Sequence, residues 1–166
     1  MNTTLKNEEK AIFALRDLYS KYGYTQYKMS KFEEYDLYVR NKDFLISDSI
    51  ITFTDTNGKL LALKPDVTLS IIKNTDDSAG VKKVYYNENV YRVSKGTHLY
   101  KEIMQVGIEC IGKADSYCIF EVLKLASESL KSISTDCVLD ITHLGLVSEI
   151  INGLNIDSVH YKDILN

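Results

Sequence analysis

Two long segments at the centre of the chain, 81–92 and 99–111, alternate apolar and polar side chains and are separated by only six residues. Alternation with a period of two predicts β-strands, and such a short connection makes two strands antiparallel neighbours. The sequence therefore predicts a long strand-loop-strand unit at the centre of the chain.

The flanking elements are read from the spacing of apolar residues and from the residues that punctuate it. Helical spacing of three and four residues predicts helices at 8–22, 116–133 and 144–152, and a shorter one at 68–73 after Pro65. Short aromatic or β-branched runs predict strands at 24–27, 35–39, 49–55, 59–63 and 137–141. Strands in irregular alternation with helices, joined largely by hairpins, predict an α+β fold with an antiparallel sheet flanked by helices.

Composition limits the class of protein. With 166 residues, 45% of them hydrophobic, the chain is long enough for one globular domain with its own core. The net charge of -3 argues against nucleic-acid binding, and no apolar stretch approaches the ~20 residues of a membrane span. We therefore expect neither a nucleic acid nor a membrane as a partner. We expect a cytoplasmic location.

The three cysteines and three histidines do not indicate metal or nucleophile chemistry. Three is an odd number, and Cys110, Cys118 and Cys137 form no C-x-x-C, so we expect inert buried thiols rather than disulfides or a zinc site. No Walker loop, G-x-G-x-x-G, G-x-S-x-G or H-E-x-x-H occurs, and His143 precedes a predicted helix as a capping residue would. No metal, cofactor or catalytic residue is predicted.

The turn at Pro65 places two polar side chains where a strand ends and a helix begins. Asp66 could accept a hydrogen bond from a ligand's ammonium group, with Thr68 beside it. It could equally do no more than cap the helix that follows. The residues alone leave these two roles open.

Polar residues also share one face of the strand at 99–111. Gln105, Gly107 and Glu109 are two residues apart, so they point the same way, and Gly107 leaves room above the strand. A solvated edge strand is the alternative, but the apolar neighbours on the other face favour the floor of a small-ligand site.

These same residues carry a family resemblance. Segment 63–68 resembles the L-[RK]-P-[DE]-x-T element of class II aminoacyl-tRNA synthetases of the histidyl branch, 90–92 resembles their motif 2, and 105–109 resembles Q-x-G-x-E. Segment 139–145 resembles the L-D-I-x-H-x-G element of the regulatory subunits of ATP phosphoribosyltransferase within that branch. The resemblance implies a class II synthetase-like antiparallel sheet.

The resemblance also implies roles for five residues. Asp66 would meet the α-ammonium group of histidine, with Thr68 beside it. Arg92 would be the motif 2 arginine, which in the synthetases faces the carboxylate and the α-phosphate of ATP. Gln105 and Glu109 would line the histidine pocket.

Departures from the synthetase pattern favour the regulatory branch. The motif 2 loop, 93–101, is one residue shorter, and Leu99 stands where the synthetases have a second arginine, which weakens the case for binding a triphosphate. Aspartate at position 66, where synthetases commonly have glutamate, fits the same branch. The chain is expected to be the N-terminal part, 1–166, of a catalytic-type domain, truncated before motif 3 and without a second domain.

The expected function is therefore that of a non-catalytic regulatory subunit. It would assemble, as a homodimer within a hetero-oligomer, with the short-form ATP phosphoribosyltransferase catalytic subunit, activate it and contribute to feedback inhibition by histidine. Two alternatives stay open: a histidyl-tRNA synthetase fragment that activates histidine with ATP, and a dimerisation module with a vestigial pocket.

Overall fold

The computed structural model describes residues 4–40, 50–75, 80–94 and 96–154. The chain divides into two compact units, 1–135 and 136–166. The first unit mixes helices with two sheets, which confirms the predicted α+β class. The prediction of a single domain over 1–166 stays a prediction.

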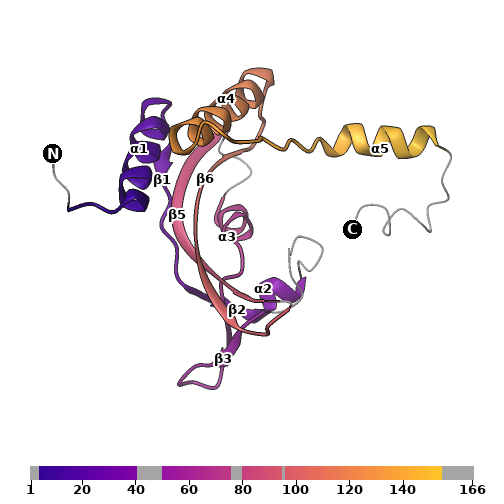
Figure 1. The fold of residues 1–166 in the computed structure, drawn as a ribbon. Helices are drawn as coiled ribbons and strands as arrows, with labels where there is room; N and C mark the ends of the chain where they lie inside the picture. The colour runs from indigo at the N-terminus through magenta and orange to yellow at the C-terminus, as the bar shows by residue number, and fades with distance from the viewer. Residues whose placement is uncertain (1–3, 41–49, 76–79, 95, 155–166) are drawn as a thin grey trace. The chain divides into compact units, whose positions relative to one another are not determined.

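The central sheet is built on the predicted strand pair. Strands β5 (Lys82–Val93) and β6 (Tyr100–Ile111) pair antiparallel through twelve registered positions (Figure 1). A two-residue strand, β1 (Thr25–Gln26), adds to the other edge of β5 in parallel, so the order is β1-β5-β6. The outer edge of β6 has no strand partner within the described residues.

A smaller sheet is formed by β2 (Phe32–Glu34), β4 (Leu60–Leu63) and β3 (Thr52–Thr54), all antiparallel, with β4 in the middle. The turn between β3 and β4 is fixed by Asp55, whose Oδ1 accepts hydrogen bonds from the backbone N–H groups of Asn57 and Lys59, each at 2.8 Å. Gly58 adopts a φ of 79°, a conformation that glycine reaches without strain in such a hairpin turn.

Helices cover both faces of the central sheet. Helices α1 (Asn7–Lys21) and α4 (Ser116–Ile133) lie against one face, as Figure 1 shows, and helix α3 (Thr68–Lys73) packs on the other. The cores on the two faces consist of separate sets of buried residues. On the α1 and α4 face they are Leu15, Tyr19, Tyr24, Tyr85 and Leu125; on the α3 face they are Val67, Ile71, Val84 and Val90.

Two predicted strands are wrong. Residues 35–39 belong to helix α2 (Tyr35–Arg40), because Tyr35, Tyr38 and Val39 also fit helical spacing and Tyr38 is fully buried on that helix. The strand that does form in this region, β2, starts three residues earlier and pairs with β4. Residues 137–141 form no strand, and Val138 and Ile141 are exposed.

Helices α4 and α5 each begin at a side-chain cap. The carboxylate of Asp115 accepts a hydrogen bond from the backbone N–H of Cys118 at 2.8 Å, at the start of α4. In the second unit, His143 Nδ1 accepts one from the N–H of Leu146 at 2.9 Å, at the start of helix α5 (Leu144–Gly153). His143 therefore acts as the predicted structural residue.

The cysteines differ from prediction in their burial. Cys118 is buried and Cys110 half-buried, but Cys137 is exposed, so the expectation of three buried thiols is wrong for that residue. Within the described residues, no cluster of three or more histidine, cysteine or acidic side chains could hold a metal ion. None of the helices described there is long and apolar enough to cross a membrane.

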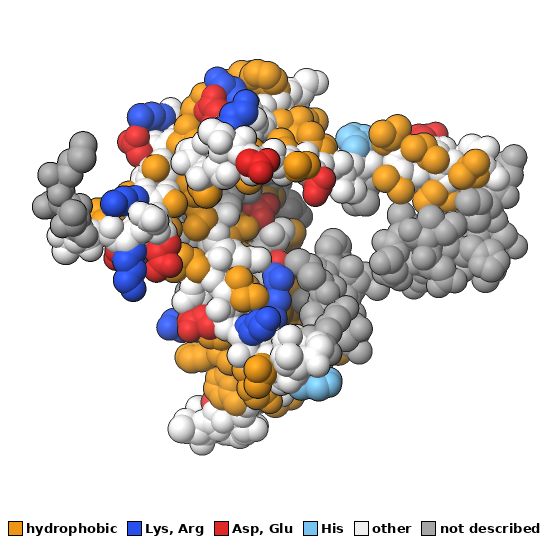
Figure 2. All heavy atoms as spheres, in the orientation of Figure 1, with side chains coloured by type: hydrophobic (Ala, Val, Ile, Leu, Met, Phe, Trp, Pro, Cys, Tyr) orange, Lys and Arg blue, Asp and Glu red, His pale blue; other side chains and the backbone are white. Residues whose placement is uncertain are grey.

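Hydrophobic side chains gather on the surface at the end of the first unit that carries the small sheet (Figure 2). Phe32 and Phe53 stack edge to face there, with ring centroids 5.2 Å apart, and Leu60 is also exposed. Exposed apolar side chains in such number are typical of contact surfaces between proteins.

Candidate ligand-binding site

The five residues predicted to bind a ligand all come to the α3 face of the central sheet. Asp66 and Thr68 lie at the start of α3, which covers this face. Glu109 lies opposite Val84 in the β5–β6 register, and Gln105, four residues earlier on the same face, lies opposite Glu88. Arg92 reaches this face as well, since its side chain contacts the turn before α3.

The hydroxyl of Thr68 donates a 2.6 Å hydrogen bond to Oε1 of Glu109 and so joins α3 to β6. Burial raises the pKa of Glu109 above its ordinary value, the Thr68 bond opposes that shift, and the nearby Asp66 charge adds to it. Glu109 is thus a half-buried carboxyl that lacks a cationic partner among the described residues.

Asp66 fulfils the structural role that the sequence left open. Its Oδ1 accepts a hydrogen bond from the backbone N–H of Leu69 at 3.2 Å, in the first turn of α3. Its charge also helps to raise the pKa values of Glu109 and Tyr86. A role toward a ligand stays a prediction.

Arg92 is anchored at one end and unsatisfied at the other. Its Nε donates a hydrogen bond to the carbonyl oxygen of Pro65 at 3.1 Å. Its Nη2 is buried and makes no hydrogen bond in the described part of the chain. A buried guanidinium N–H without an acceptor carries a free-energy penalty, which an anionic group of a ligand would relieve.

The space above Gly107 is not empty, and the expectation that it leaves room for a ligand is wrong. The ring of Tyr86 lies over it: a Cβ at position 107 would be 2.6 Å from Tyr86 Oη. Burial, followed by the charges of Glu109 and Asp66, raises the pKa of the Tyr86 hydroxyl. Sequence reasoning missed Tyr86, although its position opposite glycine in the predicted hairpin is a usable signal.

A buried ion pair supports the same face. Lys64 is 0% exposed, and its Nζ lies 3.4 Å from Oε2 of Glu88 and 3.4 Å from the carbonyl oxygen of Ser30. Burial lowers the pKa of Lys64, and Glu88 opposes that shift. The backbone carbonyl of Lys64 also accepts a 2.8 Å hydrogen bond from the N–H of Tyr91, which fixes the Pro65 turn against β5. Neither Lys64 nor Glu88 was predicted as a site residue, and their separate positions in the sequence give no sign of the pair.

The assembled groups suit a ligand that carries both charges. Asp66 and Glu109 supply carboxylates for an ammonium group, and Arg92 supplies a cation for a carboxylate. Gln105 is half-buried on the same face. The arrangement offers binding groups for an amino acid.

Comparison with known proteins gives a family match over almost the whole chain. The family model described as histidyl-tRNA synthetase matches residues 2–166. A histidine–tRNA ligase from Campylobacter hominis is 29% identical over 154 residues, which cover 87% of this chain and 38% of the ligase. An ATP phosphoribosyltransferase regulatory subunit from Oceanobacillus iheyensis is 27% identical over 146 residues, which cover 86% of this chain and 36% of the subunit.

A solved structure shares the fold. The ATP phosphoribosyl transferase (HisG:HisZ) complex from Thermotoga maritima contains a chain that matches with a TM-score of 0.68 and 19% identity. The match covers 99% of the present chain and 56% of that one. The present chain thus spans little more than a third of the two sequence relatives and about half of this structural neighbour.

Proposed function

Because the chain belongs to the histidyl-tRNA synthetase family, we propose that the face formed by Asp66, Thr68, Arg92, Gln105 and Glu109 binds free histidine. The observation that carries the proposal is the buried Nη2 of Arg92, which has no acceptor in the described residues and lies on the same face as two carboxylates. The α-carboxylate of histidine would satisfy the guanidinium, and its ammonium and imidazole groups would meet Asp66 and Glu109.

We propose further that the protein acts as a non-catalytic regulatory subunit. In this role it assembles with the short-form ATP phosphoribosyltransferase catalytic subunit in the cytoplasm, activates it and conveys inhibition by histidine. The similarity to a regulatory subunit supports this role. So does Leu99, which is 63% exposed near the hairpin tip and offers a phosphate neither a charge nor a hydrogen-bond donor where the synthetases have an arginine.

The assembly is proposed to contain a homodimer of this chain. The exposed Phe32 and Phe53 pair on the small sheet supports a protein contact there. Regulation by histidine requires that histidine bind two states of the assembly with unequal affinity, and a dimer in contact with a catalytic subunit offers such states.

A second candidate is a histidyl-tRNA synthetase activity, because a histidine–tRNA ligase is among the similar sequences. This candidate requires that the protein use ATP to form an adenylate from histidine. The two candidates differ in what histidine does: it is a substrate in one and an inhibitor of a partner in the other.

Reconstitution tests the proposal. The full chain is mixed with a short-form catalytic subunit, and the phosphoribosylation of ATP is measured with and without histidine. Activity that requires this chain and falls when histidine is added is the expected result. Histidine-dependent exchange between ATP and pyrophosphate would instead establish the second candidate. If calorimetry detects no heat of binding when histidine is titrated into the protein, the chain is a dimerisation module with a vestigial pocket.

A further inference from the structure

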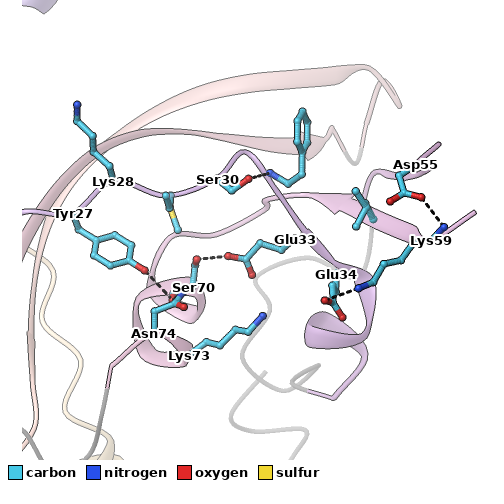
Figure 3. Close-up of a pocket in the computed structure, with 13 residues that line it drawn as sticks. Tyr27, Lys28, Ser30, Glu33, Glu34, Asp55, Lys59, Ser70, Lys73 and Asn74 are labelled. Atoms are coloured by element: carbon cyan, nitrogen blue, oxygen red, sulfur yellow. Dashed lines mark hydrogen bonds and ion pairs between the residues drawn. The ribbon is translucent and has the colours of Figure 1, made fainter. Parts of the chain in front are cut away.

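A separate cavity of about 710 Å³ lies between the segment 27–30, β2, the β3–β4 hairpin and α3 (Figure 3). None of the five residues of the proposed histidine site lines it. Its size is within the range of small-molecule sites in proteins. The chemistry of its walls therefore decides what it could bind.

A carboxylate with one unsatisfied oxygen lies in this cavity. Ser70, on α3, donates its hydroxyl hydrogen to Oε1 of Glu33, which belongs to β2. The other oxygen, Oε2, is buried and has no hydrogen-bond partner in the described part of the chain. A buried carboxylate oxygen without a donor is unfavourable, and an ammonium group is the donor that would stabilise it most.

Cations without ion-pair partners also line the cavity. Neither Lys28 nor Lys73 has a salt bridge within the described residues. Figure 3 shows the side chain of Lys73 extending toward Glu33 and Glu34. Lys73 also contributes to the lowered pKa of Glu34, after the larger effect of Lys59, whose Nζ lies 2.7 Å from Glu34 Oε1. Lys59 is thus already paired, and the Lys28 side chain extends away from Glu33, whereas Lys73 can bind an anion.

The charges around the cavity balance. Its lining contains the lysines 28, 59 and 73 and the carboxylates of Glu33, Glu34 and Asp55. A ligand with a net charge would gain attraction from one set and repulsion from the other, whereas a ligand that carries both charges can meet each set. Met29 and Leu61 provide apolar wall between the charged groups.

We propose that this cavity binds a small zwitterion of the amino-acid class. Its ammonium group binds Oε2 of Glu33, and its carboxylate binds Lys73. The site is independent of the proposed histidine site, because it uses other residues and lies at Ser70 rather than at Thr68 on α3.

Amide chemical shifts of the isotope-labelled full chain test the proposal. The probes are glycine, β-alanine and γ-aminobutyrate, which separate the two charges by increasing lengths, with acetate and ethylammonium as singly charged references. We expect at least one of the three zwitterions to shift the amides of Ser70 and Asn74 saturably, and neither reference to do so at the same concentration. Lys73→Met and Glu33→Gln should each weaken binding by about tenfold or more, as expected for loss of a charge-assisted contact.

Matched controls separate this site from the histidine site. Lys10→Met, which removes an exposed lysine on α1, and Glu109→Gln should leave the binding of the zwitterion unchanged. Lys73 is itself exposed, so its variant is expected to fold even if Glu33→Gln does not. The absence of shifts with all three zwitterions, equal shifts with the references, or undiminished binding by Lys73→Met would each overturn the proposal.

Discussion

Thr68 and Glu109 are 41 positions apart in the chain, and a 2.6 Å hydrogen bond joins their side chains. The bond connects the first residue of α3 to the central sheet at the face where Asp66 and Arg92 also lie. It holds a carboxyl group at a half-buried position where burial alone would favour the protonated form. The histidine site proposed here is therefore organised around a carboxylate that the fold destabilises.

Glu109→Gln is expected to stabilise the protein at neutral pH. The pKa of Glu109 is raised in the folded state, so the folded protein ionises this group less readily than the unfolded chain does. The free energy of unfolding therefore falls as the pH rises from the ordinary pKa of glutamate through the raised value. Below both pKa values the group is protonated in both states, and it costs no stability. Glutamine keeps an oxygen to accept the Thr68 bond and carries no charge. Urea unfolding should show the variant to be more stable at neutral pH, and its advantage should disappear below the ordinary pKa of glutamate. A variant that is less stable at neutral pH would contradict the burial effect.

Asp66→Asn should separate the capping role of Asp66 from its proposed role toward histidine. Asparagine caps helices about as well as aspartate, so the free energy of unfolding should change little. The loss of the charge should weaken inhibition by histidine in the reconstituted assembly by about tenfold or more. Asp66→Ala should lose both properties, and an unchanged histidine response in Asp66→Asn would assign Asp66 to the cap alone.

Arg92→Ala and Glu109→Ala are expected to weaken or abolish the histidine response of the assembly. Each removes a charged group that has no ion-pair partner among the described residues and that we propose to contact the ligand. The measurement is the concentration of histidine that halves the catalytic rate, with Lys10→Ala as the control on an exposed surface of α1. Inhibition that stays at the parent level would reject the assignment of the site.

Glu88→Gln should lower stability by about 1–3 kcal/mol, because it leaves the buried ammonium of Lys64 without its counter-charge. A second substitution, Lys64→Met, should recover part of the loss by removing that charge as well, and a double-mutant cycle measures the coupling. Glu34→Gln provides the matched control, since its ion pair with Lys59 is exposed. If Glu88→Gln and Glu34→Gln lower the free energy of unfolding equally, burial does not make the Lys64–Glu88 pair more important for stability than the exposed pair.

Gly107→Ala should cost about 1–3 kcal/mol, because the new methyl group would overlap the Tyr86 ring, which has to shift. In a Tyr86→Ala background the same substitution should cost less. Gly96→Ala is the control: nothing lies within 4 Å of the added Cβ, and an effect within about 0.5 kcal/mol is expected there. Additive losses for Gly107→Ala and Tyr86→Ala would show that the ring does not occupy this space.

Much of the fold followed from sequence because its elements carry strong local signals. The hairpin, α1, α3, α4 and α5 were predicted within a residue or two, since their periodicity extends over many positions or is closed by a clear punctuating residue. The segment 35–39 was assigned wrongly because five residues fit both periods, and only the burial of Tyr38 against the small sheet decides between them. The segment 137–141 was assigned wrongly because alternation predicts a strand only where a partner strand exists.

The candidate site was predicted less completely than the fold. A shared strand face and a turn are local properties, so Gln105, Glu109 and Asp66 could be selected from spacing. The contacts of Tyr86 with Gly107 and of Lys64 with Glu88 depend on register and on how a turn packs against a strand, and single-sequence patterns do not contain that information.

The register of the central sheet has a consequence for the order of folding. Val93 and Tyr100 are paired at the tip of the β5–β6 hairpin, so the first pair closes only a short loop. The other residue pairs of the two strands can then form one after another from that end. Strand β1, in contrast, holds β5 through only two registered residues, and its Thr25 pairs with Val84 across more than a third of the chain. Since short-range contacts form at the lowest entropic cost, the hairpin should be in place before α1 and β1 dock, and β1 should be the first strand of this sheet to open when hydrogen exchange is followed under native conditions.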